Sequence, residues 1–157
     1  MDQTLIENLI AKHEGRRAKV YPDSRGIPTI GIGWNLTDKD SQDICDHFGL
    51  SLPGLLDGSI LLTDAQIDEV FDYQLHEAIS EAMSILPNFN TMPDTVQAVV
   101  VDLLFNMGLP RFSQFYNTIL SLKNGNWEAA AENLRHSLWY TQVGHRAVED
   151  CAMLEAA

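Results

Sequence analysis

Apolar residues in the middle of the chain recur at intervals of three and four positions. The repeat covers 63–86, "TDAQIDEVFDYQLHEAISEAMSIL", and places one apolar stripe along a helix. Thr63 precedes Gln66 by three residues, which is the spacing of a capping box at a helix start. A helix of this length extends roughly 30–35 Å, at 1.5 Å per residue. The pattern therefore predicts a helix over 63–86 that is long enough to connect two lobes.

The apolar repeats that follow are shorter and predict a helical C-terminal half. Residues 94–107 are strongly apolar and are followed by Gly108 and Pro110, two residues that end helices. Further helices are expected around 112–123, 126–137 and 144–155. No alternating strand pattern interrupts them, so we expect the sheet to lie elsewhere.

The N-terminal third combines one helix with strand patterns. Helical spacing predicts a helix over 4–14 that Gly15 ends, and 16–36 reads as strands around the turn "YPDSRG". The fold class predicted is α+β, a single two-lobed domain with a small sheet in its N-terminal lobe. The predicted parts are an N-terminal lobe over about 14–62, a connecting helix over about 63–86, and an all-helical C-terminal lobe over about 87–157, against which the helix at 4–14 packs.

Length and cysteine content agree with one globular domain. The chain has 157 residues, and its two cysteines, Cys45 and Cys151, are too few for a disulfide framework and are expected to be free thiols. No apolar run approaches the ~20 residues that a membrane span needs. The first 15 residues carry no pattern of a signal peptide, so we expect synthesis in a cytosol.

The net charge of −12 is concentrated in one segment. Residues 37–110 hold one basic residue and thirteen acidic ones, whereas 1–36 carry +1 and 111–157 carry −1. Without a basic face of useful size, nucleic acid is a poor candidate partner. We interpret the acidic segment as a solvated surface.

Two acidic side chains flank the predicted strands. Glu14 is the last residue before a helix-ending glycine, where the negative helix end and partial burial both favour a carboxylic acid that keeps its proton. A nearby cation would act in the opposite direction, so the sequence leaves this balance open. Asp23 lies in the "YPDSRG" turn, where Asp is also common for turn geometry alone.

The strand that follows is unusual because one of its predicted faces has almost no side-chain bulk. Alternation puts Pro28, Ile30, Ile32 and Trp34 on an apolar face, and Ile27, Thr29, Gly31 and Gly33 on the other. Glycines in a strand often mark the close approach of a backbone or ligand. We therefore expect a flat floor for an extended ligand, with the Thr29 hydroxyl on it. Two carboxyl groups beside such a floor suit glycoside hydrolysis, where one protonates the leaving oxygen and the other activates water or attacks directly.

Other chemistries fit the sequence less well. Gly31 and Gly33 form only part of a dinucleotide-binding motif, and "DKDSQD" at 38–43 lacks the glycine of a calcium loop. The five histidines show no metal-ligand spacing. We therefore expect neither a metal nor a cofactor.

The N-terminal signature resembles a known family. Glu14-Gly15, Tyr21, Asp23, Gly26 and "TIGIG" at 29–33 are similar to the signature of the phage-type lysozymes, glycoside hydrolase family 24, in particular those of T-even-like phages. "LLFNMG" at 103–108, "NWEAAAENLRHSLWY" at 126–140 and "VGHRAVED" at 143–150 resemble later family segments, so the similarity covers nearly the whole chain.

The resemblance implies a role for several residues. It implies that Glu14 is the general acid, that Asp23 is the base that activates water, and that Thr29 helps to hold that water, with inversion at the sugar carbon. It also implies that Arg146 forms an ion pair with the catalytic glutamate. The substrate-binding positions that it implies are Asn35, Phe105, Thr118 and Asn133. Gly31 of the predicted glycine floor is a further substrate-binding candidate.

The implied substrate is bacterial peptidoglycan, cut at the β-1,4 bond from N-acetylmuramic acid to N-acetylglucosamine in a cleft between two lobes. The expected protein is a monomeric endolysin without nucleic-acid or membrane partners, made in the host cytoplasm and acting on the cell wall after release; entry with a virion is the other possibility. The alternatives are a hydrolase of chitin or chitosan, whose cationic chain suits an acidic protein, and a saccharide-binding module without catalysis. Trp34, where the family has a histidine, either packs in the core or stacks on a sugar.

Overall fold

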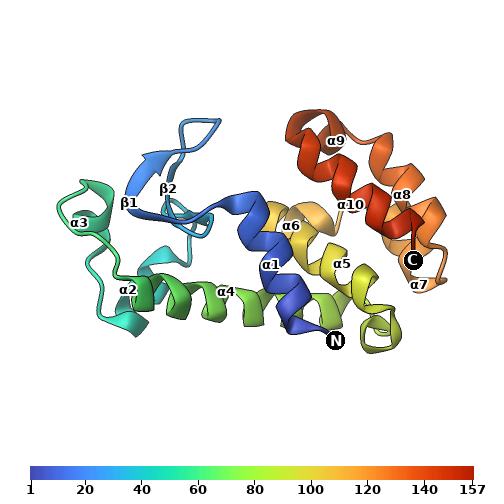
Figure 1. Cartoon of the computed structure of the whole chain (residues 1–157), viewed down its shortest axis with the longest axis horizontal. Coiled ribbons are helices and arrows are strands. Elements are labelled where there is room, and N and C mark those ends of the chain that lie inside the picture. The colour runs from blue at the N-terminus through green and yellow to red at the C-terminus, as the bar shows by residue number, and fades with distance from the viewer. The chain divides into compact units, whose positions relative to one another are not determined.

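The computed structural model describes all 157 residues, and it confirms the α+β class. Figure 1 shows the elements in chain order. The helices are α1 (Gln3–Glu14), α2 (Ser41–Phe48), α3 (Leu52–Leu56), α4 (Asp64–Ile85), α5 (Asp94–Met107), α6 (Leu109–Phe112), α7 (Tyr116–Lys123), α8 (Trp127–Arg135), α9 (Leu138–Val143) and α10 (His145–Glu155), with a 3-10 turn at Phe89–Thr91. The strands are β1 (Arg17–Pro22), β2 (Pro28–Gly31) and β3 (Trp34–Asn35).

The chain separates into two compact units. The helical unit consists of 1–10 and 76–157, and the sheet unit consists of 11–75. The chain passes between the units within α1 and again within α4. None of the helices has the length and apolar character that a membrane span requires.

The long predicted helix is present, and its start is the predicted capping box. The Thr63 backbone N–H donates to Gln66 Oε1 at 2.9 Å, and the Gln66 N–H donates to Thr63 Oγ1 at 3.1 Å. These two bonds satisfy donors that would have no partner within the helix. The helix α4 therefore begins where the sequence predicts it.

The single strand predicted to run through Gly31 and Gly33 is in fact two strands. β1, β2 and β3 form an antiparallel sheet in that order, and β2 ends at Gly31. Gly31 has φ +64° and Gly33 has φ +66°, so these residues turn the chain from β2 into β3. The predicted flat floor is therefore wrong, because the glycines form the turn of a hairpin.

The apolar side of this hairpin does lie in the core, as predicted. Ile30, Ile32 and Trp34 are at most 6% exposed. The indole Nε1 of Trp34 donates to Ser41 Oγ at 3.2 Å. Trp34 is thus a core residue, and burial excludes the alternative in which its face stacks on a sugar.

The segment 37–62, for which the sequence shows no single pattern, contains two short helices. Gly49, which has φ +66°, caps the end of α2, and Ser51 caps the start of α3, where its Oγ accepts from the Gly54 N–H at 3.2 Å. Cys45 in α2, like Cys151 in α10, is a buried free thiol.

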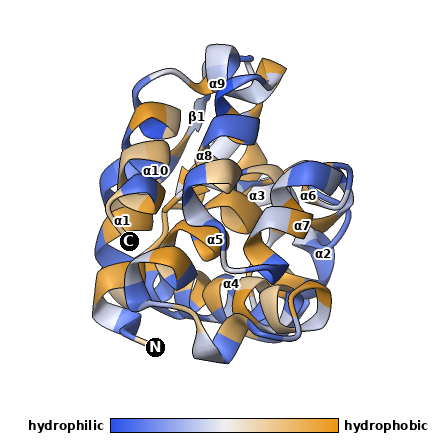
Figure 2. Ribbon diagram, turned by 90° about the vertical axis from the view of Figure 1, so that its right-hand side faces the viewer, coloured by the Kyte–Doolittle hydropathy of each residue, from blue (hydrophilic) through white to orange (hydrophobic).

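The helical unit is built around α5, whose residues from Val96 to Leu104 are all buried. Its apolar residues are the orange segments of α5 in Figure 2. Helix α10 packs on α5, α8 and α9, and α7 packs on α8. Helix α9 was not predicted, and the helix expected around 112–123 is divided into α6 and α7.

Candidate active site

The Glu14 carboxyl group lies directly on the backbone of the hairpin turn. Glu14 ends α1 and is half-buried. A Cβ atom built on Gly33 would lie only 2.5 Å from the carboxyl carbon of Glu14 and 2.5 Å from its Oε2. No real Cβ fits at that distance, so the absence of a side chain at Gly33 is what lets the Glu14 carboxyl sit there.

The Asp23 carboxylate is held by its own turn. Its Oδ1 accepts from the backbone N–H groups of Arg25 at 2.8 Å and Ile27 at 2.9 Å, and the Asp23 N–H donates to the Ile27 carbonyl at 2.9 Å. Both side-chain bonds go to one oxygen. Oδ2 is left available to accept a proton or a hydrogen bond from another molecule.

Thr29 lies on β2, the strand that pairs with β1, and Asp23 follows the end of β1. Thr29 is only 6% exposed, and its Oγ1 donates to the Ile27 carbonyl at 2.9 Å. Because that bond uses the hydroxyl proton, the oxygen lone pairs remain available as acceptors. Thr29 stands directly opposite Tyr21 in the β1–β2 pairing.

The charges of both acidic residues affect the pKa of the Tyr21 phenol. Burial raises the pKa of its phenol, and the negative charges of Glu14 and Asp23 raise it further, while Arg17 lowers it. These electrostatic effects fall off with distance. Glu14, Tyr21, Asp23 and Thr29 therefore form one cluster in the sheet unit.

The other two predicted positions in this unit have local partners. Gly31 is buried. A Cβ atom built on it would lie 3.7 Å from Leu62 Cδ1 and 3.8 Å from Ile67 Cγ2. Asn35 Oδ1 accepts from the N–H of Thr37 at 2.8 Å and from its hydroxyl at 2.6 Å. Binding of substrate by Gly31 and Asn35 stays a prediction.

In the helical unit, two predicted substrate positions line the same pocket. Thr118 of α7 and Asn133 of α8 border a pocket of about 370 Å³. Its other lining residues are Gln114, Phe115, Tyr116, Asn117, His136 and Ser137. Tyr116, which the sequence analysis did not single out, is 76% exposed. Phe105 is half-buried on α5.

Arg146 is buried and forms a two-point ion pair with Asp102 of α5. Its Nε donates to Asp102 Oδ2 at 2.9 Å and its Nη2 donates to Oδ1 at 2.6 Å. Such a paired geometry is the strong form of a charge-assisted hydrogen bond. Asp102 was not among the residues predicted for the site, and the ion pair predicted between Arg146 and the catalytic glutamate stays a prediction.

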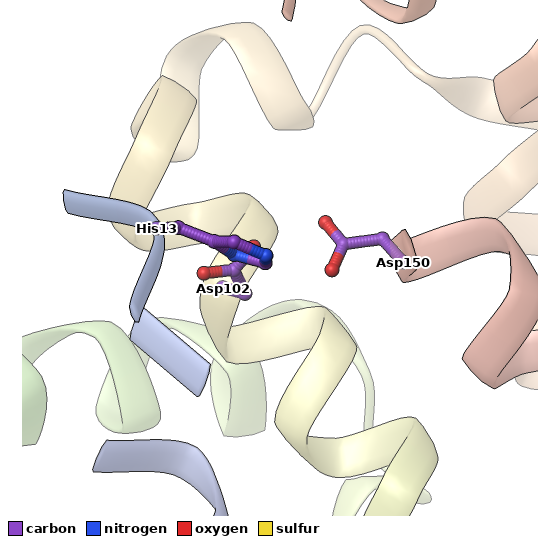
Figure 3. A group of neighbouring side chains, drawn as sticks. All are labelled: His13, Asp102 and Asp150. Carbon is purple, nitrogen blue, oxygen red and sulfur yellow. The ribbon is translucent and has the colours of Figure 1, made fainter. Parts of the chain in front are cut away.

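A second acid lies beside this ion pair. Figure 3 shows the Asp150 carboxyl group, on α10, directed toward Asp102 on α5. Asp150 is fully buried, and neither of its oxygens accepts a hydrogen bond. Burial, followed by the charge of Asp102, raises its pKa to about 10. Asp150 is therefore a neutral acid at pH 7. Its proton prevents two negative charges from lying side by side at Asp150 and Asp102.

Replacement of Asp150 by Asn should stabilise the protein at neutral and alkaline pH. The unfolded carboxyl ionises near pH 3.8 and the folded one near pH 10, so wild-type stability falls as pH rises through that interval. An amide never ionises and still offers a donor to Asp102. We expect a gain of about 2–4 kcal/mol at pH 7 and almost none at pH 4. Urea unfolding of both proteins at pH 4, 7 and 9 measures this; a difference that does not grow with pH would contradict it.

Comparison with known proteins identifies the family. The family model described as phage lysozyme matches residues 11–150. The chain belongs to the phage lysozyme family. This phage lysozyme is 31% identical over 124 residues to the endolysin of Salmonella phage P22, a match that covers 78% of this chain and 73% of the endolysin.

Two further relatives differ in length. Probable T4-type lysozyme 2 of Dictyostelium discoideum is 22% identical over 154 residues, which are 90% of this chain and 88% of the relative. Pre-baseplate central spike protein Gp5 of Enterobacteria phage T4 is 28% identical over 152 residues; the match covers 90% of this phage lysozyme but only 26% of Gp5. Family membership confirms that the protein is a glycoside hydrolase, whereas the roles of individual residues stay predictions.

Proposed function

We propose that this lysozyme hydrolyses the β-1,4 bond from N-acetylmuramic acid to N-acetylglucosamine in bacterial peptidoglycan, with Glu14 as general acid and Asp23 as general base. The observation that carries the proposal is the contact between the Glu14 carboxyl and Gly33, in the same unit that holds Asp23 and Thr29. Two carboxyl groups and one hydroxyl in the sheet unit supply the groups that this hydrolysis requires.

The bond is broken with the help of Glu14. Its protonated carboxyl donates to the oxygen that leaves with the next sugar, so that the sugar departs as a neutral alcohol. The contact with Gly33 limits how far the carboxyl can move toward the sheet. Positive charge develops at the anomeric carbon while the carbon–oxygen bond breaks.

Water attacks that carbon from the opposite face. Asp23 Oδ2 takes one proton of the water, because Oδ1 is already occupied by the two turn N–H groups. The Thr29 hydroxyl oxygen accepts the other water hydrogen. The water oxygen joins the carbon, so the product has inverted configuration and one water is consumed per bond.

The biological role that we propose is lysis of a bacterial host. Two relatives carry the names endolysin and lysozyme, which supports this role. The protein would act as a monomer on glycan strands of the wall, without nucleic-acid or membrane partners, after synthesis in the host cytoplasm. The net charge of −12 favours one other substrate, the cationic polymer chitosan.

Analysis of the products tests the proposal. Purified peptidoglycan is digested, the new reducing ends are reduced with borohydride, and the reduced sugars are identified by mass spectrometry. We expect the reduced end to be muramic acid. Reduced glucosamine ends, or cleavage of chitosan without cleavage of peptidoglycan, would contradict the proposed bond.

A further inference from the structure

Tyr21 belongs to the cluster formed with Glu14, Asp23 and Thr29 but takes no part in the proposed reaction. It stands opposite Thr29 in the β1–β2 pairing, so these two side chains lie on one face of the sheet. Asp23 follows Tyr21 by two residues, directly after Pro22, the last residue of the same strand. The ring therefore lies beside the proposed base and beside the residue that would hold the water.

Arg17 fixes the ring from one side. The guanidinium carbon of Arg17 lies 4.8 Å from the centre of the Tyr21 ring. Arg17 and Tyr21 are four positions apart in β1, and the register of the β1–β2 pair shifts between them. A strand bends at such an irregularity. A cation over the ring face and a half-buried position restrict how the tyrosine can turn.

The hydroxyl of Tyr21 makes no hydrogen bond to the chain, although the ring is half-buried. The hydroxyl oxygen itself is not enclosed by the protein, so a group from outside can reach it. The raised pKa of the phenol means that it keeps its proton at neutral pH, so it can donate. An available donor close enough to feel the charges of both acidic residues is suited to an acceptor that arrives with the substrate.

We propose that Tyr21 is a specificity-determining residue that donates a hydrogen bond to an acetamide carbonyl of the glycan chain, and that Arg17 is a positioning residue for its ring. This rests on the proposed function. The acetamide carbonyl is the strongest neutral acceptor on an N-acetylated aminosugar, whereas a de-N-acetylated sugar carries a cationic amine in its place, which is a donor only. The phenol therefore distinguishes acetylated from de-N-acetylated chains.

Tyr21→Phe removes the hydroxyl and leaves the ring under Arg17. We expect kcat/KM on N-acetylated peptidoglycan to fall about 10-fold, the effect of one neutral hydrogen bond. On de-N-acetylated peptidoglycan the variant should equal the wild type, because the acceptor is already absent. The preference for acetylated substrate therefore falls about 10-fold as well.

Tyr73→Phe is the matched control. Tyr73 is an exposed tyrosine of the same unit, in ring contact with His47 and Phe48, and belongs to no proposed site. It should leave both activities unchanged. Melting temperatures of the two variants show whether Tyr21→Phe has disturbed the fold.

Arg17→Gln tests the positioning role. We expect a loss in the same direction as for Tyr21→Phe but smaller. The double variant should be no worse than Tyr21→Phe alone, because Arg17 acts through the hydroxyl.

Two results would overturn the inference: wild-type activity in folded Tyr21→Phe, or an equal loss on both substrates. Either can occur while the wild type still cleaves peptidoglycan and Glu14→Gln does not, so this failure is separable from a failure of the proposed function. Absence of peptidoglycan cleavage by the wild type would overturn both.

Discussion

Glu14→Gln is expected to lower the rate of reducing-end release from purified peptidoglycan by about 1,000-fold, the middle of the range for loss of a general acid. Glutamine has nearly the shape of glutamate and can occupy the same place against Gly33, but its amide cannot protonate the leaving oxygen. The loss should therefore appear in kcat. Steady-state assays with soluble peptidoglycan fragments measure it.

Glu7→Gln provides the control within the same helix. Glu7 of α1 accepts from the Gln3 amide at 2.8 Å and belongs to no proposed site. It should keep wild-type activity, and both variants should keep the wild-type melting temperature. A folded Glu14→Gln variant that lyses cells at the normal rate would show that another group is the acid.

Gly33→Ala is expected to cost about 100-fold in kcat/KM, because a displacement of about 1 Å in a catalytic group has an effect of that size. The new Cβ would overlap the Glu14 carboxyl at 2.5 Å, so the carboxyl must move away from the turn. Strain from φ +66° would add a loss of stability of about 1–2 kcal/mol.

Gly49→Ala separates displacement from strain. Gly49 also has φ +66°, but a Cβ there would meet no atom within 4 Å. Both variants should lose a similar amount of stability by thermal unfolding, and only Gly33→Ala should lose activity. Equal activities in the two alanine variants would show that the Glu14–Gly33 contact does not position the acid.

Elements with local signals were predictable from the sequence. The capping box of Thr63 and Gln66 and the apolar stripe after it gave α4 to within one residue at each end, and Gly108 gave the end of α5. The short helices α2, α3 and α9 span eight, five and six residues, and such lengths carry too few turns for a periodic pattern. Their position is decided by packing.

The residues around Gly31 and Gly33 were predicted as one strand, but they form a turn. Alternation of Ile30, Ile32 and Trp34 suits a strand, and all three are buried, but two glycines one residue apart are also typical of a hairpin turn. The sequence indicated that Gly33 leaves room for something. It did not indicate that Glu14, nineteen positions earlier, fills that room.

The buried acid pair of the helical unit was also missed. Asp102 interrupts the apolar run "VVVDLLF", and a carboxylate within such a run predicts a buried ionic partner. Its actual partners, Arg146 and Asp150, come from a helix more than forty residues away. Only the three-dimensional packing of α10 on α5 brings these groups together.

In the proposed reaction Glu14 protonates the leaving sugar while Asp23 directs water to the opposite face of the same carbon. Proton NMR of a digest of soluble peptidoglycan fragments, recorded before the new reducing ends mutarotate, tests it most directly. We expect the α-anomer to appear first, because the configuration of the β-linked carbon is inverted. First appearance of the β-anomer would mean retention, and would contradict the role of Asp23 as a base that activates water.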